Sequence, residues 1–590
     1  MKTVITFLRG RAAKIGTCAV AIVIAAGLLF PEHSWAANDT VLAEAKNADT
    51  YGPSRFIDLS LLVAEGLPCT PSRGFPRFRF DRTQQVGPES AYNIETLVID
   101  GNTGTQLDVP AHSVALPELG LTNSGDFGRE LIHNVPAWKF VGEACVVDVR
   151  DLLDQAPPGV SPLIRPERVL AWEKMNRLLH PGDAVLFRSG YSDRYYLPLP
   201  AGRRYHADPM EGRVPAWPDP NPDTMELLAG QRHVHHIGCD SPTMGPIPDL
   251  GEPTHFAALK YGAVFTEALT GLEQLPEQGA FYCMMGPKHC DGPYGEGRAF
   301  AIVGNPLAAR LIESARAKRV VDLSVVNSID HPITWPGRGA DRHRQPYTKN
   351  DVLWAPHLKL YHHGHTMDSG AGTHMVTPAY ALPLSRLDGS RFPPGVRDWH
   401  REFEERYGAL GGTDRTAEKV SLAQTCGWSR VIDVSGLVGT TERTQWPSSP
   451  QITVEVIKRY EAMTGPLRPD EIVLLRSGHT DRTFKPFGEG KACMAAPLAG
   501  ETEGWPALGA DAVEYLHAKG IRCVGTDSPT LGGVDEKQAL LTYWSLGSHD
   551  MIGVEFLTNL GALPDKAFFL FAPVKIQGGH SAPGRAIGLY

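Results

Sequence analysis

After residue 36, the 590-residue chain has no apolar run long enough to cross a bilayer, which argues against an integral membrane protein. It also lacks a tract of basic residues and has a formal net charge of −9, so nucleic acid is not an expected partner. No Gly-x-Ser-x-Gly elbow occurs, which argues against serine hydrolase chemistry. We therefore expect a soluble protein that takes a small-molecule substrate.

The first 36 residues predict an export signal. Four basic residues precede a mostly apolar run from Ile15 to Phe30, and Ser34-Trp35-Ala36 provides a small-x-small cleavage site. An uncleaved membrane anchor is the alternative, but the run is short for a span. The segment holds four basic residues and one acidic residue, a net +3, so the mature chain carries −9 − 3, about −12. We expect a secreted or periplasmic protein with no membrane contact after cleavage.

Eight cysteines follow residue 36, and none of them forms a Cys-x-x-Cys pair. Four lie in apolar, strand-like runs, namely Cys145, Cys239, Cys283 and Cys523. In such surroundings a buried free thiol is favoured over a disulfide or a metal ligand. Some pairing stays open for an exported protein.

An internal repeat explains the length of the chain. Three short runs recur in the same order: residues 56–60 with 320–324, residues 185–190 with 473–478, and residues 238–243 with 525–530. Their offsets are 264, 288 and 287 residues (320 − 56, 473 − 185 and 525 − 238). Lys288 with Lys575 and Arg298 with Arg585 keep the last offset. The chain is therefore expected to be a tandem duplication.

Each copy alternates helical runs with apolar, strand-like runs. The expected pairs of helix and strand are 166–179 with 184–188 and 223–230 with 234–239 in the first copy, and 454–463 with 472–476 and 510–519 with 522–525 in the second. This alternation predicts a layered α/β fold. Residues 305–318, rich in alanine and charge, predict a short helical connector between the copies.

The stretch from Gly104 to His112 carries several groups suited to a metal site. Gln106 and Asp108 are two residues apart, so on extended chain an amide oxygen and a carboxylate point to the same face and both reach one cation. His112 is a natural base beside such a cation, because an imidazole titrates near neutral pH. Taken alone, the stretch is more often a turn with a solvated histidine.

Residues 102–112, Asn-Thr-Gly-Thr-Gln-Leu-Asp-Val-Pro-Ala-His, resemble a known signature. It is that of the metal-dependent cyclase and amidohydrolase family, which includes bacterial kynurenine formamidase, isatin hydrolase and trans-dienelactone hydrolase, and it is written His-x-Gly-Thr-His-x-Asp-x-Pro-x-His. Asn102 and Gln106 replace its first two histidines. The resemblance implies the swivelling β/β/α fold over residues 53–305 and again over 318–590, with the copies packed as a pseudo-dimer.

The resemblance also implies a metal shell completed by a histidine and a glutamate twelve residues apart. His255 and Glu267 have that spacing, since 267 − 255 = 12; a loop cap and the start of a solvated helix are the alternatives. The implied ligands of one divalent ion, Mn²⁺ or Zn²⁺, are Gln106, Asp108, His255 and Glu267, with His112 as the base. The amide of Asn102 would bind a second ion only weakly, so one ion is expected.

The second copy keeps little of the signature. His374 and Glu555 remain as additional candidates, but Val376 replaces the aspartate, Tyr380 replaces the base, and Tyr543 stands where the downstream histidine is expected, since 555 − 12 = 543. Because valine cannot hold a cation, we expect a pseudo-site. A nearby cluster leaves a site of another kind open, and it consists of His362, His363, His365 and Asp368.

The implied reaction is hydrolysis of an amide, lactam, ester or lactone bond of a small cyclic or N-acyl substrate by metal-activated water. A cyclase or lyase that stabilises an enolate with the same ion is an alternative, separated by labelled oxygen in the product. A non-catalytic binding protein is another, but a pure binder has no need of His112. A homo-oligomer is also left open.

Overall fold

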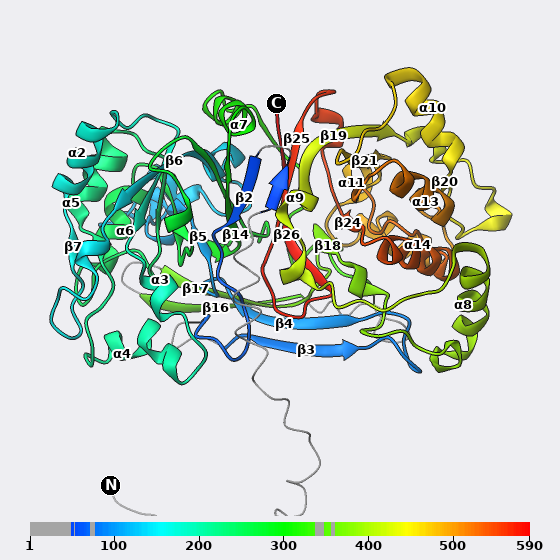
Figure 1. Cartoon of the computed structure of the whole chain (residues 1–590), viewed down its shortest axis with the longest axis horizontal. Helices are drawn as coiled ribbons and strands as arrows, with labels where there is room; N and C mark the ends of the chain where they lie inside the picture. The colour runs from blue at the N-terminus through cyan, green and yellow to red at the C-terminus, as the bar shows by residue number, and fades with distance from the viewer. Residues whose placement is uncertain (1–48, 52–53, 71–76, 337–346, 356–359) are drawn as a thin grey trace, which may run out of the picture. The chain divides into compact units, whose positions relative to one another are not determined.

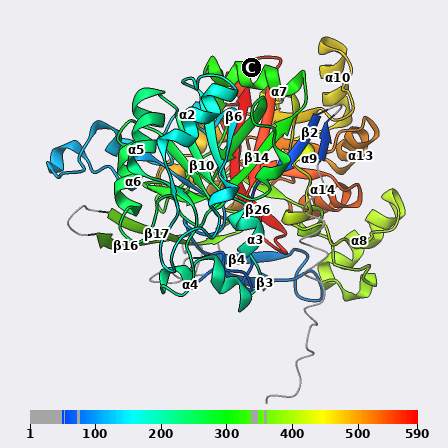
Figure 2. The same cartoon turned by 60° about the vertical axis from the view of Figure 1, so that its left-hand side comes forward.

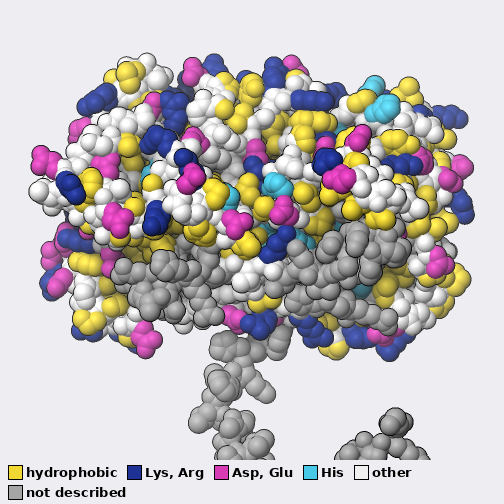
Figure 3. Space-filling model, turned by 180° about the vertical axis from the view of Figure 1, so that it is seen from behind, with side chains coloured by type: hydrophobic (Ala, Val, Ile, Leu, Met, Phe, Trp, Pro, Cys, Tyr) yellow, Lys and Arg dark blue, Asp and Glu magenta, His cyan; other side chains and the backbone are white. Residues whose placement is uncertain are grey.

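The computed structural model describes residues 49–51, 54–70, 77–336, 347–355 and 360–590. The expected export signal, residues 1–36, lies outside these ranges. Within them, every helix is too short or too polar to cross a bilayer. On the face drawn in Figure 3, basic and acidic side chains are interspersed over the visible surface.

The first copy is built on a 10-stranded sheet with the order β1-β2-β14-β12-β6-β8-β10-β11-β5-β13. Its strands are β1 Asp49–Tyr51, β2 Ser54–Asp58, β5 Gln106–Asp108, β6 Val141–Asp148, β8 Asp183–Arg188, β10 His236–Cys239, β11 Val264–Glu267, β12 Ala280–Met285, β13 Tyr294–Glu296 and β14 Arg298–Val303. β6, β8, β10 and β11 are parallel neighbours and almost wholly buried. Their continuous apolar runs fit strands that are covered on both faces.

Helices α2 Pro166–Met175, α5 Pro222–Met225 and α6 Gly251–Leu259 gather on the outer side of the first copy (Figure 1). The first predicted helix ends four residues early, at Met175, and Leu179 then donates its N–H to Glu173 Oε1. The second predicted helix, 223–230, is α5 continued by a π-helical turn, Glu226–Gln231. Their apolar faces pack on the parallel strands in one core cluster.

The second copy repeats this arrangement on an 8-stranded sheet with the order β15-β26-β18-β24-β23-β21-β19-β25, in which β25 also pairs with β26. Its strands are β15 Val320–Asp322, β18 His374–Val376, β19 Cys426–Asp433, β21 Ile472–Arg476, β23 Cys523–Thr526, β24 Ile552–Glu555, β25 Phe568–Pro573 and β26 Ser581–Leu589. Helices α10 Val454–Thr464, α13 Ala510–Ala518 and α14 Glu536–Ser548 gather on its outer side (Figures 1 and 2). The expected helices and strands of this copy are thus present to within one or two residues.

The smaller elements also recur between the copies. They are the short strand pairs β7 Leu163–Ile164 with β9 Asp219–Pro220 and β20 Gln451–Ile452 with β22 Ala507–Leu508, and the short helices α3 Tyr191–Tyr195 and α4 Ala207–Met210 with α11 His479–Thr483 and α12 Ala495–Leu498. Helix α9, Leu422–Thr425, stands where the first copy has the 3-10 turn Ala137–Phe140. The longer α8, Pro394–Tyr407, belongs to the second copy. Helix α7, Leu307–Arg316, is the predicted connector.

A third, 4-stranded sheet is shared by the two copies, and it lies as a separate layer in Figures 1 and 2. Its order is β16-β17-β4-β3, with β3 Arg79–Gln84, β4 Ile94–Asp100, β16 Thr348–Ala355 and β17 Leu360–Asp368. The antiparallel β4–β17 pair sets Val98 opposite Thr366. These two residues are repeat counterparts, since 366 − 98 equals 372 − 104, the offset between Gly372 and Gly104. A strand of the second copy is therefore bonded to the strand that leads into the first copy's signature.

One hydrophobic cluster runs through both copies. It contains Phe281 and Phe300 from β12 and β14 together with Phe568 and Ile587 from β25 and β26. Cys145, Cys239, Cys283 and Cys523 are buried free thiols, as predicted. The shared core means that separating the copies would expose large apolar surface to water.

Candidate metal centre

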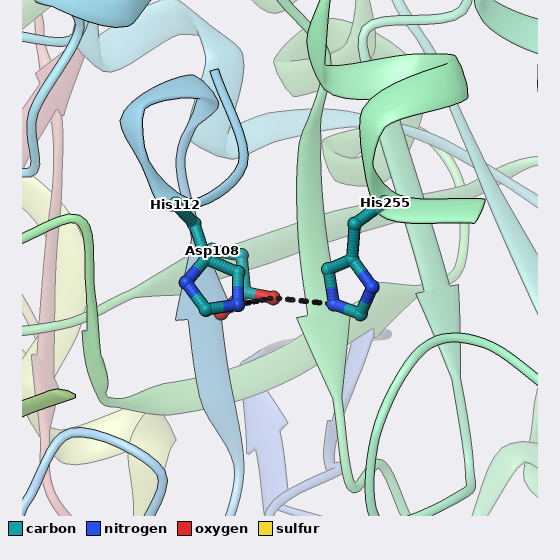
Figure 4. Close-up of side chains that lie close together, drawn as sticks. All are labelled: Asp108, His112 and His255. Carbon is teal, nitrogen blue, oxygen red and sulfur yellow. Dashed lines mark ion pairs between the residues drawn. The ribbon is translucent and has the colours of Figure 1, made fainter. Parts of the chain in front are cut away.

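Asp108, His112 and His255 converge in the first copy (Figure 4). Asp108 ends β5, His112 lies in the 3-10 turn Pro110–His112 that follows, and His255 projects from α6. Asp108 Oδ2 lies 3.5 Å from His255 Nε2 and 3.9 Å from His112 Nε2. One possible ligand atom from each residue lies within 4.8 Å of the others, a spacing that one cation could bridge.

Local sequence explains how Asp108 and His112 come together. Pro110 fixes its φ and cannot donate to a ladder, so the strand stops and a 3-10 turn begins there. His112 N then donates to Val109 O at 2.8 Å. The turn brings the imidazole back over the end of the strand, where the ring of Tyr294 packs against it at 4.9 Å between centroids.

The downstream pair that the resemblance implies, His255 and Glu267, also reaches this point. β11 pairs with β5 so that Glu267 lies opposite Gln106. Glu267 Oε1 is 3.3 Å from His255 Nε2, while His255 Nδ1 is 2.8 Å from Gly251 O. The second contact fixes the orientation of the ring and turns Nε2 toward the carboxylates. The role of His255 and Glu267 as ligands stays a prediction.

The electrostatics of this cluster suit a cation. Asp108 is fully buried, and neither of its carboxylate oxygens accepts a hydrogen bond within the described part of the chain. Burial and the charge of Glu267 raise the pKa of Asp108 to about 7, against the pull of His255. Burial would lower the pKa of His255, but Asp108 and Glu267 raise it to about 10. Buried carboxylates without donors are costly unless a positive charge faces them, so these residues fit a divalent ion.

Gln106 is oriented differently from the expectation. Its amide nitrogen Nε2 donates to Asn102 Oδ1 at 2.9 Å and also to Glu267 Oε2. Asn102 Nδ2 in turn donates to Asp100 Oδ1 at 3.1 Å. Ligation of an ion by the oxygen of Gln106 stays a prediction that would require the amide to turn over.

The Gly-Thr pair of the signature, Gly104 and Thr105, stabilises the backbone around the site. Gly104 has φ +69°, and a Cβ there would lie 2.8 Å from Val63. Thr105 Oγ1 donates to Ala268 O at 2.7 Å and accepts from Leu61 N at 2.9 Å. Ala268 directly follows Glu267 and has φ +58°, which is uncommon for a residue other than glycine. Thr105 therefore holds the backbone turn that aims Glu267.

A small cavity lies beside the cluster. Its lining includes Asn102 and Ala268, which adjoin Gln106 and Glu267 through a hydrogen bond and the chain respectively, and the rings of Tyr196, Tyr205 and His206. Sequence reasoning missed these three rings, because aromatic residues are as common in cores as in pockets. The only sequence feature that could have pointed to these three residues is that they follow the repeated run 185–190.

The second copy has lost the cluster. His374 Nε2 lies 3.2 Å from Glu555 Oε2, but Val376 occupies the aspartate position. Glu555 Oε1 instead accepts hydrogen bonds from Tyr543 Oη and Leu531 N, both at 2.6 Å. Within the described residues, no third potential ligand lies close enough to share an ion with His374 and Glu555. Tyr543 thus hydrogen-bonds the glutamate from the position where the family signature has a histidine.

The cavity has a filled counterpart in the second copy. Phe484 and Met494 stand for Tyr196 and His206, at the same offset of 288 (484 − 196 and 494 − 206), and Phe556 stands for Ala268. Phe556 packs on Phe484 with 5.9 Å between centroids, and it belongs to a buried cluster with Met494. Phenylalanine in place of alanine thus occupies the corresponding space.

The histidine cluster of the second copy lies at the boundary with the first. His363 N donates to Tyr294 Oη at 2.6 Å, and His365 stacks on His289 at 3.9 Å between centroids. Asp368 Oδ1 accepts from Gly370 N at 2.7 Å. The side chain of His362 lies outside the described residues. Among those described, this cluster does not converge on one metal position.

A second group of potential ligands, His133, Cys290 and Asp291, is less suited to an ion. Burial and Asp291 raise the pKa of the Cys290 thiol to about 11, so the thiol holds its proton. Burial lowers the pKa of His133, and Lys288, Arg585 and Lys349 lower it further. Three nearby cations oppose another positive charge.

Comparison with known proteins shows which family the chain belongs to. A model described as a putative cyclase matches residues 57–246 and 321–532, inside the ranges expected for the two copies. Kynurenine formamidase from Salinibacter ruber (strain DSM 13855 / M31) is 26% identical over 185 residues, or 31% of this chain, and the match spans 66% of that protein's length.

This chain is also similar to solved structures, including the following two. Isatin hydrolase A from Ralstonia solanacearum is 22% identical with a TM-score of 0.36, covering 50% of this chain and 100% of that one. A potential metal-dependent hydrolase with cyclase activity is 18% identical with a TM-score of 0.29, covering 46% of this chain and 96% of that one. Because the family model matches both copies and more than half of the residues, the chain belongs to the cyclase family, as a tandem duplication of its domain.

Proposed function

We propose that this protein is a metal-dependent hydrolase with one active site, located in the first copy. The observation that carries the proposal is the buried Asp108 carboxylate, whose oxygens accept no hydrogen bond within the described residues and face His255 and His112. Glu267 completes the cluster, and the cavity adjoins it. The second copy supports the assignment by contrast, since Val376 and Phe556 occupy the corresponding positions.

Asp108, His255 and Glu267 would hold the ion, which is Mn²⁺ or Zn²⁺ because oxygen and nitrogen donors are mixed. When bound, such an ion acts as a Lewis acid that polarises a carbonyl and lowers the pKa of water. The negative charge of two buried carboxylates offsets the charge of the ion.

His112 is the proposed base. It takes the proton of the attacking water as the C–O bond to the substrate carbonyl forms, and returns it to the nitrogen or oxygen that departs when the acyl bond breaks. The ring of Tyr294, 4.9 Å away between centroids, limits how far the imidazole can turn. Such proton transfer contributes roughly 10² to 10⁴ in rate.

The side chains that line the cavity indicate the kind of substrate. The rings of Tyr196, Tyr205 and His206 line it and suit a small, flat, apolar body. We propose a small cyclic or N-acyl amide, lactam, ester or lactone as the substrate. The protein is proposed to meet it outside the cytoplasm, after export directed by residues 1–36.

We further propose that the two copies pack as the subunits of a family dimer would. This rests on the β4–β17 pair about the counterparts Val98 and Thr366, and on the shared core. Through β17, His363 N reaches Tyr294, which packs on His112. The second copy would then support the site of the first without catalysing a reaction itself.

The test is turnover of small amides, lactams, esters and lactones by the Mn²⁺- or Zn²⁺-loaded chain in ¹⁸O-labelled water. One labelled oxygen in each carboxylate formed is the expected result. Substrate consumption without label would replace hydrolysis by a lyase or cyclase reaction. If the metal-loaded protein binds these compounds but turns none of them over, a binding function would replace the proposed hydrolase function.

A further inference from the structure

We propose that Asn102 and Gln106 are positioning residues that form a hydrogen-bonded relay from Asp100 to Glu267. They occupy the positions of two histidines in the family signature, but in the relay they orient Glu267 and do not bind the ion. The inference rests on the proposed metal site in the first copy. It concerns how that site is held together and which side chains touch the ion.

The direction of the relay follows from its fixed end. Asp100 Oδ1 accepts from the backbone N of Asn102 at 2.9 Å, so this oxygen is an acceptor. Asn102 Nδ2 donates to the same oxygen at 3.1 Å, which turns Oδ1 of Asn102 toward Gln106. Gln106 must then present its nitrogen, and it does so at 2.9 Å.

The far end of the relay holds one oxygen of Glu267. Gln106 Nε2 has two hydrogens, and it uses the second to donate to Glu267 Oε2. The other oxygen, Oε1, accepts from Met244 N at 2.5 Å and lies 3.3 Å from His255 Nε2. With separate partners on its two oxygens, the carboxylate is fixed in plane and direction before an ion arrives.

The second copy lacks this relay. Gly370 replaces Asn102, and His374, in place of Gln106, places its Nδ1 2.8 Å from Gly372 O and so has a single nitrogen left for Glu555. Tyr543 Oη anchors the other oxygen of Glu555. Thus the relay occurs in the copy that retains Asp108 and His255. This association is expected if the relay serves the metal site.

Loss of a partner that orients a ligand commonly weakens metal binding by about 10-fold to 100-fold. We therefore expect Gln106→Met and Asn102→Ala each to weaken Mn²⁺ or Zn²⁺ binding by about that factor. The double variant should bind no more weakly than Gln106→Met alone, because both changes interrupt the same chain.

The experiment measures the dissociation constant of the ion by competition with a chelator, and stoichiometry by elemental analysis, on the mature chain and these variants. Wild-type affinity in Asn102→Ala, or a double-variant loss equal to the product of the single losses, would overturn the relay. Asn176→Ala is the matched control, because Asn176 Nδ2 donates to Glu277 Oε2 at 3.1 Å at a site outside the cluster. Equal weakening in this control would also count against the relay.

Failure of the relay is separable from failure of the proposed function. A wild-type chain that binds no ion contradicts the metal site itself, whereas a chain that binds one ion regardless of Asn102 contradicts only the relay. If a variant does not fold, a crystal structure of the ion-loaded wild type decides. The relay requires Gln106 Nε2 on Glu267, and an oxygen of Gln106 at about 2.0 to 2.2 Å from the ion would refute it.

Discussion

Lys575 Nζ of the second copy lies 2.6 Å from Asp58 Oδ2 of the first. The reciprocal pair joins Lys288 Nζ of the first copy to Asp322 Oδ2 of the second at 2.9 Å. Arg298 completes the first pair, 2.9 Å from Asp58 Oδ1. Burial would raise the pKa of Asp58, but Arg298 and Lys575 hold it below its usual value. The repeated Asp, Lys and Arg of the sequence thus fasten the copies together.

Breaking one of these buried pairs should destabilise the whole chain. Lys575→Met leaves Asp58 with Arg298 alone, and loss of one hydrogen bond to a charged group costs about 1.5 to 3 kcal/mol. We expect a lower urea midpoint of unfolding, and a similar drop for Lys288→Met. Arg401→Met is the control, because Arg401 and Asp398 form an exposed pair worth about 0 to 1 kcal/mol. A Lys575→Met midpoint equal to that control would show that the pair does not fasten the copies.

The Gly-Thr motif offers a matched pair of variants. Thr105→Val removes the hydrogen bond to Ala268 O, and Thr373→Val removes the equivalent bond to Phe556 O, 2.7 Å long in both copies. Each should cost about 1 to 3 kcal/mol of stability, because a buried carbonyl loses its donor. Only Thr105→Val should also weaken binding of Mn²⁺, since Ala268 follows Glu267. Chelator competition measures this, and equal metal affinity in the two variants would argue against the role given to Thr105.

Filling the cavity should separate substrate binding from metal binding. Ala268→Phe copies the second copy, where Phe556 has φ +60° against +58° for Ala268, so the backbone accepts the change. We expect the variant to keep its ion and to lose turnover. Phe556→Ala is the reciprocal control, expected to lower stability by about 3 to 5 kcal/mol and to leave turnover unchanged. Full turnover by Ala268→Phe would place the substrate elsewhere.

His112 can be a base or a ligand, and one variant distinguishes the roles. Because its Nε2 lies farther from Asp108 Oδ2 than that of His255, 3.9 Å against 3.5 Å, we expect His112→Ala to retain the ion. Turnover should fall by about 10² to 10⁴ as the base is lost. Elemental analysis of His112→Ala, together with its turnover rate, distinguishes the two roles. Loss of the ion in His112→Ala would make His112 a ligand.

Local features were predictable from the sequence. Offsets between repeated runs predicted the duplication, and the apolar periodicity predicted helices such as α10 and strands such as β21. Each of these depends on residues close in sequence or on a pattern that repeats. The C-terminal end of α2 was predicted four residues too late, at Leu179 instead of Met175. Leu179 N donates to the side chain of Glu173, six residues earlier, and not to a helical carbonyl.

Non-local features were not predictable. The β4–β17 pair joins strands 268 residues apart, and no residue pattern in either strand indicates which strand it pairs with. The direction of the Gln106 amide depends on Asp100 and Asn102, which sequence reasoning had treated only as ligand positions or not at all. The replacement of Ala268 by Phe556 is visible in the sequence, but its effect on the cavity appears only when Phe484 and Met494 are seen beside it.

The central claim is one divalent ion held at Asp108. The most direct measurement is elemental analysis of the purified mature chain beside Asp108→Ala, with the exposed Asp151→Ala as a control. We predict one Mn or Zn per chain in the wild type and in Asp151→Ala, and none in Asp108→Ala. Absence of metal from all three after supplementation, or one ion retained in Asp108→Ala, would contradict this account.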